Sequence, residues 1–119
     1  MADVRETLAE IDATLKNIEQ VVNLPQMTKD IAALEEEAAA PNLWDNQENA
    51  QRVTSKLSYL QAERNRIVTL RRRVDDVPVL LELAEAENDV ASLAEAEKEV
   101  NELQHAVSEL EVQIGRAHV

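Results

Sequence analysis

The last third of the chain carries a strict heptad repeat, and this repeat constrains the fold more than any other feature. Its apolar residues follow one another in alternating steps of three and four: Leu93, Ala96, Val100, Leu103, Val107, Leu110 and Ile114. This spacing places every apolar side chain on one face of an α-helix. We therefore expect a long amphipathic helix over about residues 89–114, with Gly115 as its C-cap.

The same periodicity recurs earlier in the chain and predicts further helices. We expect helices over residues 4–22, from Pro25 to the residue before Pro41, and over about 46–77. A short helical connector over residues 79–87 is expected to begin after Pro78. The prolines set these boundaries because proline disfavours helical conformation in the residue before it and is tolerated in a first turn.

Composition and charge support an all-α fold. The 119 residues include one Gly, no Cys and no Phe, a composition unlike that of sheet proteins. Residues 47–74 hold seven basic and two acidic side chains, whereas residues 75–114 hold twelve acidic side chains and one basic. Antiparallel packing of the basic helix 47–74 against the acidic helix 89–114 would bury both apolar stripes and set opposite charges side by side. The expected architecture is an elongated antiparallel helical bundle with coiled-coil-like long helices.

Several classes of protein are excluded by what the chain lacks. Without Cys it has no disulfide or thiolate chemistry. No apolar run reaches the roughly 18 residues that a membrane span needs, and the first residues do not resemble a signal peptide. We expect a cytoplasmic protein without a membrane partner.

Residues 41–46 hold the only Trp, in a polar segment between two predicted helices. Asp45, with Glu48 three residues later, has the pattern of a capping box at the start of the long helix. Leu43 and Trp44 directly precede this cap. We expect Leu43, Trp44 and Asp45 to form a structural plug at the end of the bundle, with a ligand or partner contact by Trp44 as the alternative.

The sequence offers no convincing catalytic, cofactor or metal site. Glu102 and His105 have the spacing of a di-iron ligand pair, but the heptad seam places both on the outer face of the helix. His118, the other histidine, is four residues beyond the last seam position. We therefore predict no catalytic residues, no cofactor, no metal and no enzymatic activity.

Arg71, Arg72 and Arg73 form the strongest basic cluster. These three side chains are a candidate partner surface that would contact the phosphates of an RNA. The alternative is that they pair with acidic residues of the connector, which are Asp75, Asp76, Glu82 and Glu85. Base stacking is not expected because no aromatic residue interleaves the cluster.

The loop and its flanks resemble a known family. PNLWDN at residues 41–46, followed by QENAQRVTSKLSYLQAERNRI, resembles the N-terminal domain of the bacterial class I peptide chain release factors. The resemblance includes ATLKNIE at residues 13–19 and the run from Arg71 to Pro78 that precedes LLELAEAEND. It covers roughly residues 3–114, and the Trp after Leu in the loop is more similar to factor 2 than to factor 1.

This resemblance implies a role in translation termination. Factor 2 reads the stop codons UAA and UGA, and its decoding and Gly-Gly-Gln hydrolysis elements lie in later domains. A chain with no Phe and one Gly has neither element. The resemblance implies that residues 1–114 are a monomeric docking module, which contacts the stalk base of the large ribosomal subunit and a translational GTPase. Residues 115–119 depart from the family pattern, and we interpret them as a foreign tail left by truncation.

A second hypothesis follows from the heptads alone. Exposed heptad seams are typical of coiled-coil scaffolds, so the chain would then be a free-standing helical adaptor that self-associates. The two hypotheses differ in whether the seams are satisfied within one chain.

Overall fold

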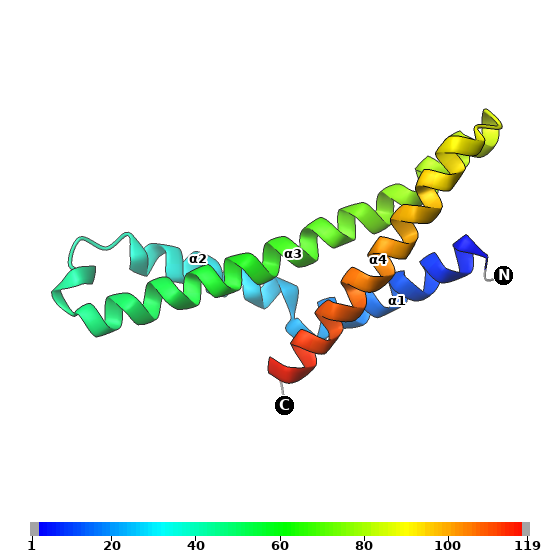
Figure 1. Ribbon diagram of the computed structural model, residues 1–119. Coiled ribbons are helices and arrows are strands. Elements are labelled where there is room, and N and C mark those ends of the chain that lie inside the picture. The colour runs from blue at the N-terminus through cyan, green and yellow to red at the C-terminus, as the bar shows by residue number, and fades with distance from the viewer. Residues whose placement is uncertain (1–2, 118–119) are drawn as a thin grey trace. The chain divides into compact units, whose positions relative to one another are not determined.

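The computed structural model describes residues 3–117 and consists there of helices without strands (Figure 1). The elements in chain order are α1 (Val4–Val22), α2 (Leu24–Ala38), the short 3₁₀ helix η1 (Leu43–Asp45), α3 (Gln47–Ala86) and α4 (Val90–Ala117). The prediction of an all-α fold is confirmed. No helix in the described residues is long and apolar enough to cross a membrane.

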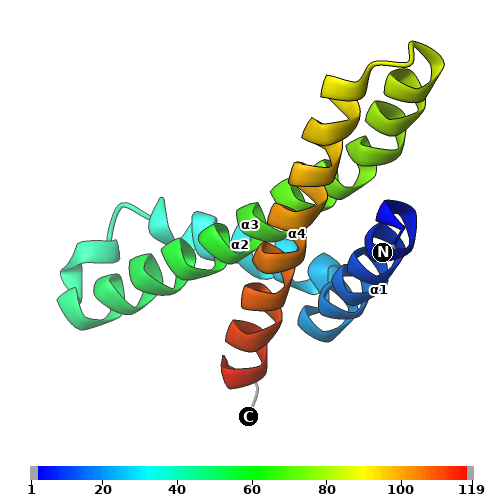
Figure 2. The ribbon, with the colours of Figure 1, turned by 45° about the vertical axis from the view of Figure 1, so that its right-hand side comes forward.

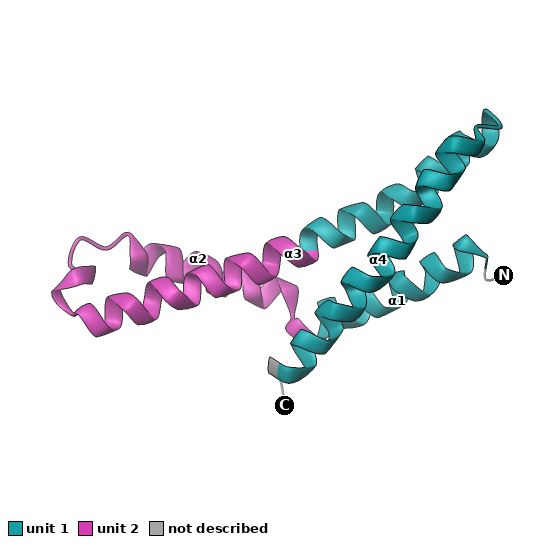
Figure 3. Ribbon diagram, viewed as in Figure 1, with its two compact units in different colours: residues 1–21, 68–119 teal, residues 22–67 magenta. Residues whose placement is uncertain are grey.

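The chain divides into two compact units, coloured separately in Figure 3. One unit combines residues 1–21 with residues 68–119, and the other comprises residues 22–67. Helix α3 contributes its first half to the second unit and its second half to the first.

The first unit consists of α1, the second half of α3 and α4, whose ribbons Figure 2 shows. Ion pairs join Arg5 to Glu85 and Glu19 to Arg71, so α1 runs antiparallel to this part of α3. The buried side chains are Leu8, Ile11, Leu15 and Ile18 from α1, Leu70, Val74, Val77, Leu81 and Ala84 from α3, and Ala96, Val100, Leu103, Val107, Leu110 and Ile114 from α4. Leu81 and Ala84 lie in the segment for which a separate connector was predicted, and the other residues lie in the predicted helices. Burial of these faces is the main stabilising contribution, since isolated helices are marginal in water.

The second unit pairs α2 with the first half of α3. Leu34, Leu43, Ala50 and Val53 form its buried cluster, with Ala38, Leu57 and Leu60 packed against it. Asn23 separates α1 from α2 in a left-handed conformation, with φ of 54°, and its side chain accepts a hydrogen bond from the Gln26 N–H. Pro25 lies in the first turn of α2, as expected.

The prediction that Pro78 begins a separate connector helix is wrong, because α3 continues through it to Ala86. Proline removes one backbone hydrogen bond and crowds the carbonyl four residues before it, here that of Val74. The apolar seam nevertheless continues without interruption past Pro78, through the buried residues Leu81 and Ala84. Burial of this last part of α3 therefore outweighs the local penalty, and Pro78 itself is exposed.

The turn between α3 and α4 is fixed by backbone and side-chain hydrogen bonds. Asn88 adopts a left-handed conformation with φ of 52°, and the N–H groups of Asn88 and Asp89 donate to the carbonyls of Glu85 and Ala84. This is the Schellman arrangement that ends a helix. Asp89 then caps α4, accepting from the Ser92 N–H at 3.1 Å and from the Ser92 hydroxyl at 2.7 Å. The predicted break at Asn88-Asp89 is confirmed.

Two predictions at the start of α3 are corrected. The cap is Asn46, whose side chain accepts from the Asn49 N–H at 3.0 Å, because Asp45 is taken up in the 3₁₀ turn η1. Trp44 does not plug the bundle, since its side chain is 61% exposed, whereas Leu43 is buried in the α2–α3 cluster. The 3₁₀ turn points successive side chains in different directions, so only one of the pair faces the core.

Gly115 is not a C-cap, because α4 continues to Ala117 and no glycine of the described chain has a positive φ. His118 and Val119 lie outside the described residues. The interpretation of 115–119 as a foreign tail stays a prediction.

Candidate interaction site

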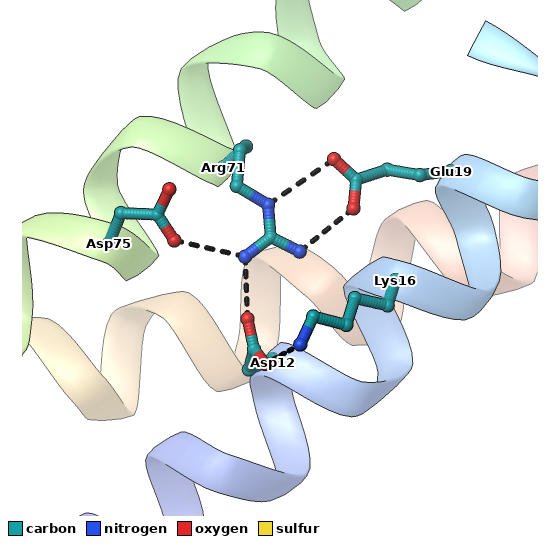
Figure 4. Close-up of polar contacts among 5 residues, drawn as sticks. All are labelled: Asp12, Lys16, Glu19, Arg71 and Asp75. Carbon is teal, nitrogen blue, oxygen red and sulfur yellow. Dashed lines mark hydrogen bonds and ion pairs between the residues drawn. The ribbon is translucent and has the colours of Figure 1, made fainter.

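Arg71 lies at the centre of an ion-pair network that joins α1 to α3 (Figure 4). Its Nε and Nη2 donate to the two carboxylate oxygens of Glu19 at 3.2 and 2.8 Å. Its Nη1 donates to Asp12 Oδ1 at 2.5 Å and to Asp75 Oδ1 at 3.0 Å. Asp12 also pairs with Lys16 at 3.1 Å. The planar guanidinium thus satisfies three carboxylates with its fixed fork of donors.

Arg73 makes the equivalent connection from α3 to α4. Its Nη2 and Nε donate to the carboxylate of Glu99 at 2.6 and 3.3 Å, and Glu102 lies 3.7 Å from Nη2. The expected pairing of the basic helix with the acidic helix is therefore present at this position. Arg73 meets Glu99 and Glu102, whereas the later α3 residues Leu80, Leu83 and Ala84 line one groove with the earlier α4 residues Ser92 and Glu95. This order confirms that the second half of α3 and α4 pack antiparallel.

Arg72 differs from its two neighbours. It is exposed, and no residue in the range 3–117 forms an ion pair or hydrogen bond with its side chain. Of the three predicted contact residues, only Arg72 has a guanidinium that no described residue pairs with.

The pKa shifts of Arg71, Arg73 and Asp12 agree with the ion pairs that these residues form. Hydrogen bonding to Glu19, and then to Asp12 and Asp75, raises the pKa of Arg71 against the opposing effect of burial. Hydrogen bonding to Glu99 likewise raises the pKa of Arg73. The Arg71 guanidinium lowers the pKa of Asp12, chiefly through its hydrogen bond to that carboxylate. All of these shifts favour the charged forms, as expected for a structural clamp rather than for acid–base catalysis.

The acidic partners predicted for Arg71, Arg72 and Arg73 were Asp75, Asp76, Glu82 and Glu85. Of these four, Asp75 does pair with Arg71. The partners that were not predicted, Asp12, Glu19 and Glu99, come from distant parts of the chain. Asp12 and Glu19 are separated by seven residues, one heptad, beside the apolar seam of α1. An acidic side chain repeated at this spacing is the signal that would have indicated a charged flank.

A surface groove of about 410 Å³ lies between α1 and α3, beside the ion-pair network around Arg71. It is lined by Arg5, Leu8, Ala9, Asp12, Val74, Asp75 and Pro78. Its carboxylates are those that already bind Arg71, and its one cation, Arg5, pairs with Glu85 at 2.7 Å. The groove therefore has no uncommitted charged group.

Within residues 3–117 no group of three His, Asp or Glu side chains is placed to hold a metal ion. Glu102 and His105 are both exposed, off the buried seam of α4, and Glu102 lies beside Arg73 of α3. The charged side chains of Arg71 and Arg73 join helices together, and Arg72 is the member of the cluster left exposed to solvent.

Comparison with known proteins decides the family. A PCRF domain match covers residues 27–117, which is most of the chain. The chain belongs to the PCRF domain family. It is 54% identical, over 93% of its length, to peptide chain release factor 2 of Acidothermus cellulolyticus. The corresponding values are 53% over 94% for the Salinispora tropica factor 2 and 49% over 95% for that of Streptomyces avermitilis.

This PCRF domain spans 30–31% of the length of those three relatives. The match lies in the N-terminal part of the factors. The resemblance that the loop at residues 41–46 indicated is therefore confirmed.

Proposed function

We propose that this PCRF domain is the N-terminal docking module of a peptide chain release factor that directs termination at UAA and UGA. The observation that supports the proposal is the identity of about half the residues to release factor 2, sustained along nearly the whole chain. The choice of codons follows from the resemblance to factor 2. The module would work in the cytoplasm, where bacterial ribosomes are found.

The partners follow from the same proposal. The large ribosomal subunit, at its stalk base, is the surface to which the domain docks, and a translational GTPase is a second partner. The ion pairs of Arg71 with Glu19 and of Arg73 with Glu99 join α3 to α1 and to α4, which supports a fixed arrangement of these helices for such contacts. We assign no catalytic step to this chain, because a sequence with one Gly cannot contain Gly-Gly-Gln.

Burial of the seams supports docking over self-association. The heptad positions of α1 and α4 are buried against other helices of the same chain, so they are not available for a second copy. The adaptor hypothesis requires these seams to be exposed.

Titration with ribosomal subunits tests the proposal. The chain, labelled at its N-terminus with a fluorescent dye, is titrated with large subunits, small subunits and whole bacterial ribosomes, and binding is followed by fluorescence anisotropy. We expect saturable binding to large subunits and whole ribosomes, and its displacement by unlabelled full-length release factor 2. No binding to large subunits, or equal binding to both subunits without displacement, would contradict the proposal.

The role of Arg72 is tested in the same titration. If Arg72 contacts a phosphate, Arg72→Glu weakens binding. It also reduces the slope of log affinity against log salt concentration by about one. Arg116→Glu is the matched control, because it makes the same change of charge near the end of α4. Equal effects of the two variants would indicate general repulsion instead of a contact by Arg72.

A further inference from the structure

A second groove, of about 380 Å³, lies between α3 and α4 near the turn that joins them. It belongs entirely to the first unit, coloured teal in Figure 3. Its lining residues are Leu80, Leu83 and Ala84 from α3, Glu87 from the turn, and Ser92, Glu95, Ala96 and Glu99 from α4. We call this feature the hairpin groove.

The hairpin groove exposes leucines that folding has left without a partner. The side chains of Leu80 and Leu83 are 48% and 57% exposed, although the adjacent seam residues Leu81 and Ala84 are almost fully buried. The two leucines are three residues apart and so lie on one flank of α3. Single exposed leucines are ordinary, but neighbouring leucines that line a groove are typical of a binding surface.

Acidic side chains surround this apolar flank. Glu87 follows the end of α3, in the turn four residues after Leu83, and Glu95 and Glu99 are four residues apart on the facing flank of α4. Glu99 is occupied by Arg73. Glu87 and Glu95 form no ion pair with any residue between 3 and 117, and both are exposed. The groove therefore combines an apolar floor with two carboxylates whose charges are not compensated by the chain.

We propose that the hairpin groove binds a basic amphipathic helix of a partner protein. Two packed helices leave a groove along each flank, into which a third helix can pack its own apolar stripe. Leucine, isoleucine or methionine residues on the partner would contact Leu80 and Leu83, and its Lys or Arg residues would pair with Glu87 and Glu95. A cationic partner is favoured because the segment 75–114 carries twelve acidic residues and one basic residue, which attract cations over a wide surface.

This inference rests on the proposed function in treating the chain as a docking module, but it names a separate surface and a different kind of contact. The ribosomal docking described above does not require the hairpin groove. The two statements therefore fail independently.

A designed peptide tests the groove directly. The probe is a fluorescein-labelled peptide of about 18 residues, long enough for several helical turns, with Leu along one face and Lys on its flanks. Two control peptides are an isomer with the leucines scattered around the helix and a version with Glu in place of Lys. We expect saturable binding of the probe by anisotropy, and affinities about tenfold weaker or more for both controls.

Matched variants of the chain locate the binding. Leu83→Gln and Glu95→Gln are expected to weaken binding of the probe by about tenfold and by severalfold, respectively. Val112→Gln and Glu109→Gln are the controls, because Val112 is 52% exposed and both residues lie on α4 outside the groove. Circular dichroism establishes that each variant keeps its helices, which is expected since all four side chains are exposed.

Three outcomes would overturn the inference. They are the absence of saturable binding, an equal loss in the groove and control variants, and a self-association of the chain that Leu83→Gln abolishes, which would assign the groove to a second copy. Binding of the probe without binding to large subunits would contradict the proposed function alone. Binding to large subunits without binding of the probe would contradict this inference alone.

Discussion

Arg71 illustrates how a single residue fixes the packing of two helices. Its guanidinium reaches Glu19 through two nitrogens and Asp12 through the third, a geometry that a lysine ammonium cannot reproduce. Each partner keeps some contact with solvent, so the energy of each pair is modest. The network therefore specifies which flank of α1 faces α3, while the buried apolar residues supply most of the stability.

Removing the Arg71 side chain is expected to destabilise the fold. Arg71→Ala leaves Asp12 and Glu19 without their cation, and we expect the free energy of unfolding to fall by about 1–2 kcal/mol. Arg72→Ala is the control, with an expected change within about 0.5 kcal/mol, because that side chain is exposed and makes no ion pair with the described residues. Urea denaturation followed by circular dichroism measures both values. Equal losses in the two variants would show that the clamp does not stabilise the fold.

The contribution of Asp12 is expected to depend on pH. Arg71 holds the pKa of Asp12 below its ordinary value of 3.8 in the folded chain. Because the folded pKa is the lower one, the stabilisation is present above 3.8 and is lost as the pH falls through the folded pKa. A double-mutant cycle with Asp12→Asn and Arg71→Leu should give a coupling energy of about 0.5–1 kcal/mol near neutral pH, and the coupling should weaken as the pH falls below 3.8. A coupling that is unchanged in acid would contradict the assignment.

At the scale of the elements, the sequence predicted the helices from their seams and both ends of α1, but it misplaced ends of the other helices. The steps of three and four located the buried faces of α1, α2 and α4 correctly, because burial repeats with the helix over many residues. The ends depend on single residues whose local preferences compete. Asn46 and Asp45 are both good caps, and only the 3₁₀ turn before α3 decides between them. Pro78 has the local signal of a boundary, yet the tertiary contacts of Leu81 and Ala84 carry α3 past it.

Replacing Pro78 should make α3 more stable. Pro78→Ala restores the N–H that can donate to the Val74 carbonyl and removes the crowding between ring and carbonyl, so we expect a gain of about 1–3 kcal/mol. Pro25→Ala is the control, since Pro25 lies in the first turn of α2 and its replacement should give no gain. The measurement is the midpoint of urea denaturation at constant m-value. A loss of stability in Pro78→Ala would mean that the neighbouring packing requires the proline.

The candidate site was predictable only in part, and the reason is the distance along the sequence. Asp75 lies one turn from Arg71, and helix geometry alone predicts that contact. Asp12 and Glu19 are reached only after α1 has packed against α3 in the correct rotation, which the sequence does not encode locally. The hairpin groove depends in the same way on how α3 and α4 pack. The sequence alone therefore could not predict that Leu80 and Leu83 line a groove.

For the whole molecule, the seams and the charge favour a chain that stays alone in solution. The heptad residues of α1 and α4 are buried within the chain, and they do not present the exposed apolar seam that a coiled-coil dimer needs. A formal net charge of −12 adds repulsion between copies at neutral pH. The basic segment 47–74 is the one part of the sequence that could offset this repulsion in a second copy.

The state of association is therefore the last prediction. Light scattering should give a mass near 13.3 kDa at a low and at a high protein concentration. The measurement is repeated in added salt, which screens the repulsion between copies. It then shows whether the chain stays monomeric because of repulsion or because it lacks a surface for self-association. We expect a monomer in both solutions, because no apolar seam is available to join two copies. A mass that doubles with concentration would favour the scaffold hypothesis. If Leu83→Gln then restored the monomer, the hairpin groove would be the surface through which the copies associate.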